Sequence, residues 1–135
     1  MSTVVEGLDW TRMTEDMNEL GCALTSPILT PEQCAEFVSM FEQDELFRST
    51  IDMARYRFGK GRYRYFANPV PAPVARLRAA FWPHLLPIAR DWADKLGRPA
   101  PWPEDFSAKA PMRHGVSVVR SGHRHTLALV LHDAA

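Results

Sequence analysis

Histidines gather near the carboxyl end of the sequence, where four of the five occur from residue 114 onward. His123 and His125 are two residues apart, so on a strand they would share one face and could chelate a metal. His132 and Asp133 add an imidazole and a carboxylate, and three mixed nitrogen and oxygen ligands suit non-haem iron or catalytic zinc. The spacing fixes no third ligand, however, so we assign no metal ligand in this sequence.

Arginines and aromatic residues alternate in the middle of the chain, between positions 55 and 66. Arginine contacts phosphates and aromatic rings stack on bases, so this segment could bind an anionic partner such as nucleic acid. The alternative is a two-sided strand pair, with its rings toward helices and its arginines paired to acidic residues nearer the amino terminus. The candidate residues for an anionic partner are Arg55, Arg57, Arg62, Arg64, Tyr63 and Tyr65.

Other catalytic signatures are missing from the sequence. It contains no Gly-x-Ser-x-Gly, Cys-x-x-Cys or His-Glu-x-x-His motif. Gly59 and Gly61 flank Lys60, but no helix start follows them to supply converging N–H groups, so they form no phosphate loop. Cys22 and Cys34 are expected to be reduced thiols in the core.

The amino-terminal half must position these groups through helices. Apolar residues recur at helical spacing over residues 10–20, and Gly21 can end that helix. Residues 22–24 are expected to form a short strand. Thr30, Pro31 and Gln33 predict a second helix start with a capping box. The buried stripe of this helix is expected to be Cys34, Phe37, Val38 and Phe41.

Beyond residue 50 the pattern changes to alternation. Residues 51–66 predict a β-hairpin that turns at 59–61, followed by an extended proline-rich linker at 69–73. Residues 74–96 repeat at helical spacing up to Gly97, and Pro83 and Pro87 should break or kink this segment. Residues 98–111 read as a proline-rich loop. Residues 116–131 alternate again and predict a second hairpin with an apolar face.

Length and charge limit the class of protein. The 135 residues include 16 basic and 16 acidic ones, which fits a single soluble domain. Residues 1–50 carry two basic and ten acidic residues, so the net charge of zero hides an acidic first part and a basic remainder. No apolar run approaches the ~20 residues that cross a bilayer. Without a signal peptide, we expect a cytoplasmic protein and exclude a disulfide-stapled or membrane fold.

Two blocks carry a family resemblance. Residues 53–66, running into the prolines at 69–73, form the first block. Residues 112–117 and 120–127, running through 132–134, form the second. Both resemble the ends of a bacterial 2-oxoglutarate/Fe(II)-dependent oxygenase family (prolyl-hydroxylase-like). The resemblance implies Fe(II) and 2-oxoglutarate as cofactors, and a double-stranded β-helix (jelly roll) behind auxiliary helices.

The sequence departs from that family where the metal should bind. The resemblance implies a His-x-Asp motif and a distal histidine as iron ligands, yet no His-x-Asp occurs in the sequence. Only residues 97–111 stand where the family would place this segment, too few for the missing jelly-roll strands. Arg113 and Arg124 are candidate contacts for the cofactor carboxylate. We therefore expect no bound cofactor and no catalytic residue in this chain alone.

The expected fold is α+β, with amino-terminal helices, a β-hairpin and the terminal strands of an incomplete jelly roll. It forms one domain, divided into a helical and hairpin region at 1–97, a junction at 98–111 and a strand pair at 112–135. The function implied by resemblance is a hydroxylase-like dioxygenase, truncated and inactive by itself. The alternative is a non-catalytic binding module that uses the basic hairpin. Uncovered edges of the last strand pair predict a homodimer or strand exchange; nucleic acid is the less favoured partner.

Overall fold

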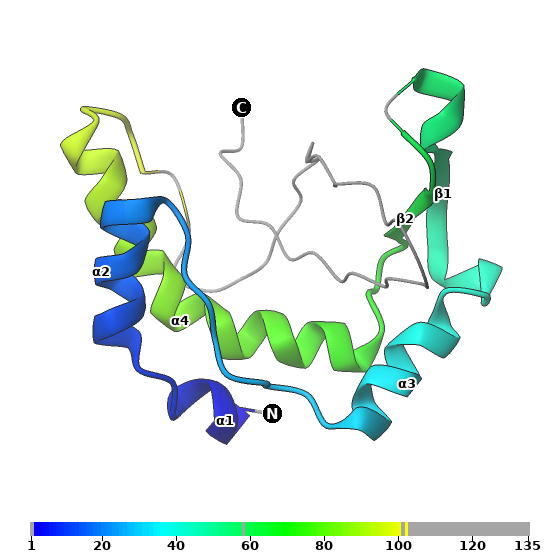
Figure 1. Cartoon of the computed structure of the whole chain (residues 1–135), viewed down its shortest axis with the longest axis horizontal. Coiled ribbons are helices and arrows are strands. Elements are labelled where there is room, and N and C mark those ends of the chain that lie inside the picture. The colour runs from blue at the N-terminus through cyan, green and yellow to red at the C-terminus, as the bar shows by residue number, and fades with distance from the viewer. Residues whose placement is uncertain (1, 58, 101, 103–135) are drawn as a thin grey trace.

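The computed structural model describes residues 2–57, 59–100 and 102. This part of the chain contains four α-helices and a two-stranded antiparallel sheet, so α and β elements are both present as expected. In Figure 1 the described elements form a U, with the first part of the longest helix at its base, the sheet on one arm and two helices on the other. The expected jelly roll and the strand pair at 112–135 lie outside the described residues and stay predictions.

Helices α1 (Ser2–Glu6) and α2 (Trp10–Leu20) form the start of the chain. Asp9 caps α2 by accepting a hydrogen bond from the Arg12 N–H, and Gly21 ends it with a left-handed φ of 75°. The predicted bounds of this helix are therefore confirmed. The strand expected at residues 22–24 is wrong, since the residues between α2 and the next helix form no regular structure.

Helix α3 (Pro31–Met40) begins with the predicted capping box. The Thr30 hydroxyl accepts from the Gln33 N–H at 3.2 Å, and the Gln33 side chain accepts from the Thr30 N–H at 2.9 Å. The predicted buried stripe is wrong, however, because Met40 is the buried residue of this helix and Cys34 is exposed. Val38 and Cys22 are exposed as well, so the expectation that both cysteines lie in the core is also wrong.

The hairpin pairs β1 (Phe47–Asp52) with β2 (Arg62–Phe66) in antiparallel register, with Thr50 opposite Arg64. A short 3₁₀ turn (Asp44–Leu46) precedes β1, and a second one (Met53–Tyr56) follows it. The hairpin is confirmed, but its first strand begins earlier than the alternation indicated. Arg55 and Arg57 consequently lie in the connection and not on a strand.

Helix α4 (Ala72–Lys95) forms the base of the U and part of one arm. Pro73 lies in its first turn, where a proline is tolerated, so the linker ends earlier than expected. Pro83 and Pro87 lie inside one continuous helix, which changes direction along its course (Figure 1), so the predicted kink is confirmed and the break is not. The helix ends before Gly97, whose φ is 62°.

The core lies where the other helices meet α4. Val5 of α1 is fully buried, and Trp10 of α2 stacks on His84 with 4.3 Å between the ring centroids. Helix α4 supplies most of the buried apolar residues of the described part. Those in α4 include Val74, Leu77, Ala80, Trp82, Leu86 and Ala93. Burial of this apolar surface stabilises the packing of the helices, and α4 runs from the end of β2 to the opposite arm (Figure 1). None of the helices in the described ranges is long and apolar enough to cross a membrane.

Candidate functional site

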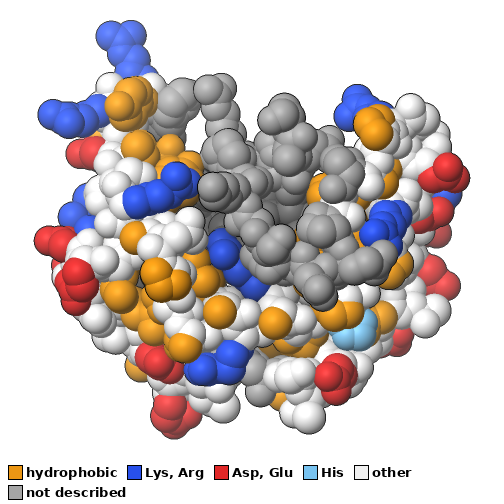
Figure 2. Space-filling view, turned by 180° about the vertical axis from the view of Figure 1, so that it is seen from behind, with side chains coloured by type: hydrophobic (Ala, Val, Ile, Leu, Met, Phe, Trp, Pro, Cys, Tyr) orange, Lys and Arg blue, Asp and Glu red, His pale blue; other side chains and the backbone are white. Residues whose placement is uncertain are grey.

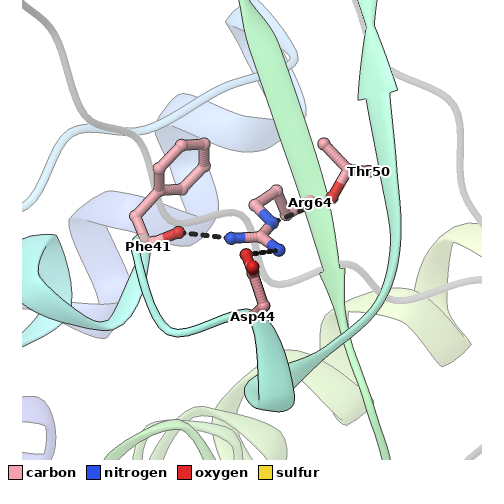
Figure 3. A network of polar contacts seen from close by, with 4 residues as sticks. All are labelled: Phe41, Asp44, Thr50 and Arg64. Atoms are coloured by element: carbon pink, nitrogen blue, oxygen red, sulfur yellow. Dashed lines mark hydrogen bonds and ion pairs between the residues drawn. The ribbon is translucent and has the colours of Figure 1, made fainter.

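Arg64 anchors the hairpin to the segment that follows α3 (Figure 3). Its Nε donates to the Thr50 hydroxyl at 2.9 Å, its Nη1 donates to the Phe41 carbonyl, and its Nη2 lies 2.8 Å from an Asp44 carboxylate oxygen. The Arg64 side chain is only 10% exposed, whereas the Asp44 side chain is 91% exposed. The guanidinium thus joins both strands to the turn after α3.

Aromatic rings surround this guanidinium. Its central carbon lies 4.2 Å from the centroid of the Phe47 ring and 5.6 Å from that of Phe41. Phe47 also stacks on Phe66, with the ring centroids 4.8 Å apart. These contacts and the pairing with Asp44 agree with the structural alternative for Arg64, in which the arginine binds within its own chain.

Four other basic residues of the hairpin lie at its end. We call Arg55, Arg57, Lys60 and Arg62 the basic tip; the side chains of all four are exposed. Figure 2 shows Lys and Arg side chains at the end of this arm. Arg62 lies 5.5 Å above the Phe41 ring, and Asp52, opposite it in register, caps the 3₁₀ turn through the Ala54 N–H. No described residue forms an ion pair with the basic tip.

The backbone of the connection explains why the tip protrudes. Arg57 adopts a left-handed φ of 58°, and Gly59 and Gly61 have φ values of 110° and 134°. Glycine reaches such angles at little cost, whereas most other residues do not. The chain can therefore leave β1, form a 3₁₀ turn and return to β2 while the side chains of Arg55, Arg57 and Lys60 stay exposed.

Tyr63 and Tyr65 lie on the other face of β2, with an edge-to-face arrangement and 5.6 Å between ring centroids. The guanidinium of Arg48 lies 5.3 Å above the Tyr65 ring. Sequence reasoning grouped these tyrosines with the arginines of β2. The pleat separates them, because neighbouring residues of a strand point to opposite faces.

Two arginines of α4 were missed by sequence reasoning. Arg90 donates to the carbonyl of Trp102 at 3.2 Å, and burial lowers the pKa of the Arg78 guanidinium below its ordinary value. Both lie in the helical repeat of residues 74–96, which contains other charged residues as well, so no signal in the sequence distinguishes them.

The described residues do not fit an iron site. No group of three or more His, Cys, Asp or Glu side chains that could hold a metal occurs in this part of the chain. His84, which lies in the middle of α4, is stacked against Trp10. Arg113, Arg124 and the four carboxyl-terminal histidines lie outside the described residues.

A shallow cavity of about 370 Å³ lies near the start of α1 and α3, away from the hairpin. It is lined by Ser2, Gln33, Arg76, Ala79 and Ala80. Arg76 is its one ionisable side chain, so the cavity offers no acid–base pair for catalysis.

Part of the chain is similar in sequence to known proteins. The chain is 43% identical over 56 residues to each of two uncharacterized proteins of Mycobacterium tuberculosis, one of them from strain CDC 1551. The matched region is 42% of this chain and 24% of each relative, so the match spans about a quarter of the length of these curated proteins. No solved structure shows significant similarity to the chain.

A family model matches the chain in two stretches, residues 61–110 and 106–134, which begin at the last glycine of the hairpin connection. The model describes an oxygenase that catalyses oxidative methylation of damaged DNA. The description confirms the oxygenase part of the expected resemblance, while the prolyl-hydroxylase-like subtype stays a prediction. Since the two stretches together cover more than half of the sequence, the chain belongs to this oxygenase family.

Proposed function

We propose that this chain carries the helical and hairpin framework of an Fe(II)/2-oxoglutarate-dependent dioxygenase, but not the segment that would hold the iron. By itself the chain is expected to be inactive. One observation carries this proposal: the two stretches matched by the family model meet at residues 106–110, inside the short proline-rich junction. The sequence has no His-x-Asp motif there or elsewhere.

The framework supports the proposal through its packing. Arg64 and the rings around it hold the hairpin against the end of α3, and α4 connects that arm to the other one. An oxygenase needs such a rigid support because its cofactor performs the oxidation while the protein supplies position and a dry pocket. In this chain the described residues supply that support.

Anaerobic titration with Fe(II) and 2-oxoglutarate tests the proposal. We expect no stoichiometric iron binding, no metal-to-ligand charge-transfer band and no conversion of 2-oxoglutarate to succinate in air. A family member that carries His-x-Asp serves as the positive control under the same conditions. Stoichiometric iron binding with a charge-transfer band in the 135-residue chain would show that the proposal is wrong.

A second candidate function rests on the basic tip. Four exposed cations within eight residues, with no ion-pair partner in the described part of the chain, form a surface for an anionic partner such as nucleic acid. Arg64 does not belong to this surface, because its guanidinium is bound within the chain. This function requires no cofactor.

The second candidate is tested by titrating a fluorescent single-stranded oligonucleotide at several salt concentrations. We expect binding that weakens with salt and is lost in the variant with Arg55→Ala and Arg62→Ala. A variant with Arg12→Ala and Arg76→Ala, which removes two exposed arginines elsewhere, should bind as the unchanged chain does. Equal losses in both variants would indicate a net-charge effect and argue against a site at the tip.

A further inference from the structure

We propose that the anionic partner of the basic tip is the acidic face of α2 in a second copy of this chain. We define this acidic face as Glu15 and Glu19, and the exposed Leu20 follows Glu19 at the end of the same helix. The proposal rests on the anion-binding role of the tip and names its partner. The surfaces involved differ from the strand pair expected at residues 112–135, for which the sequence predicts strand exchange.

The acidic face is electrostatically unfavourable in the isolated chain. Glu15 and Glu19 are four residues apart on α2, so their carboxylates are neighbours on one side of the helix and repel each other. Glu19 also lies in the last turn, where the helix dipole disfavours negative charge, and that turn contains no basic residue. No described residue forms an ion pair with Glu15 or Glu19. Cations from another molecule would relieve both effects.

The basic tip has the opposite deficiency. Arg55, Arg57 and Lys60 are close in sequence, and Asp52, the nearest acidic residue along the chain, is used to cap the 3₁₀ turn. Tyr56, between the two arginines, has 59% of its surface exposed. Tyrosine and arginine are the residue types that contribute most at protein interfaces.

Apolar surface accompanies the acidic face. Leu20 is 72% exposed and Leu96, at the end of α4, is 66% exposed. The two helix ends are neighbours, because the Trp92 indole N–H donates to the Asn18 side chain at 2.6 Å. An aromatic ring from the tip can therefore find apolar contacts beside the carboxylates.

The arrangement of the described elements requires that the basic tip and the acidic face come from two different molecules. The basic tip and α2 lie on opposite arms of the U (Figure 1), so the tip does not reach the acidic face of its own chain. Figure 2 shows basic side chains at the end of the hairpin arm. Contact between two copies neutralises the charge of the basic tip and of the acidic face together. A nucleic acid would neutralise the charge of the tip alone. A contact between the tip of one copy and α2 of another joins two different surfaces. Such a contact generates rings or open chains, unless two copies bind each other reciprocally and form a closed dimer.

Sedimentation velocity on the full chain tests this proposal. We expect self-association in about 0.01 M salt and monomers in about 1 M salt, since the Debye length falls from ~30 Å to ~3 Å over that range. Reversing the tip (Arg55→Glu with Arg57→Glu) or the acidic face (Glu15→Lys with Glu19→Lys) should each weaken self-association by at least about tenfold, or about 1.4 kcal/mol. A mixture of the two variants should associate again, because each then carries the charge that the other lacks.

A matched control reverses Glu32 and Glu36, which have the same spacing on α3, and should associate as the unchanged chain does. Failure of the mixture to associate, or association that high salt does not affect, would overturn the proposal; the second result would favour strand exchange instead. If the chain stays monomeric but its tip binds an oligonucleotide, this inference fails and the anion-binding role stands. If the chain neither associates nor binds an oligonucleotide, both fail.

Discussion

The guanidinium of Arg64 lies over the ring of Phe47, with 4.2 Å between its central carbon and the ring centroid, and its edge binds the segment after α3. One side chain of β2 therefore touches β1, the turn after α3 and two aromatic rings. Because the cation is nearly buried and its polar contacts are directed, we assign it to the stability and orientation of the hairpin.

The first prediction concerns this anchor. Replacing Arg64 with Met should lower the free energy of unfolding by about 1–3 kcal/mol, because the hydrogen bond to the part-buried Phe41 carbonyl is lost. Asp44→Asn should have a much smaller effect, since the Asp44 side chain is largely in water. Urea denaturation of both variants checks this order, and a larger loss for Asp44→Asn would contradict it.

The second prediction compares two neighbouring valines of α1. Val5 is fully buried and Val4 is 43% exposed. Val5→Ala should cost about 2 kcal/mol, because it removes buried methyl groups and leaves a cavity against the core. Val4→Ala should change stability by less than half of that. Thermal and urea unfolding measure both, and equal effects would place α1 differently against α4.

The third prediction concerns the start of α3. Thr30→Ala should cost about 1 kcal/mol because the Gln33 N–H loses its acceptor. Ser26→Ala, in the irregular segment before this helix, is the control and should be close to neutral. Far-ultraviolet circular dichroism during urea unfolding reports the difference, and an unchanged midpoint for Thr30→Ala would show that the cap does not contribute.

The fourth prediction concerns the two thiols. Cys22 and Cys34 are both exposed, so a maleimide or disulfide reagent should modify both in the native chain without denaturant. Single Cys22→Ser and Cys34→Ser variants assign the two reactions. Reaction of either thiol only after unfolding would restore the expectation that it lies in the core.

The local features of the fold could be predicted from sequence. The capping box at Thr30 and the left-handed Gly21 depend on side chain to backbone contacts within a few residues, so the sequence contains all the information they need. The buried side of α3 could not be predicted in the same way. Met40 and not Cys34 faces the core, because the neighbouring elements decide which side is covered.

The candidate site was predictable only in part. The basic hairpin was identified from its alternation, but Arg55 and Arg57 leave the strand because a 3₁₀ turn interrupts it. The binding role predicted for Arg64 differs from its observed setting, since its partners Phe41 and Asp44 lie more than 19 residues away in sequence. Whether a charged side chain is exposed or bound within the chain depends on such distant contacts, and the local alternation of residue types gives no information about them.

The two interior prolines of α4 have a consequence for the angle between the arms. Proline has no N–H, so the carbonyls of residues 79 and 83 have no helical donor four residues later. Helix α4 therefore behaves as two stiff rods joined where two rungs of its hydrogen-bond ladder are missing. A residue at position 83 or 87 that restores a rung would change the spacing of the basic tip and α2 while altering neither surface.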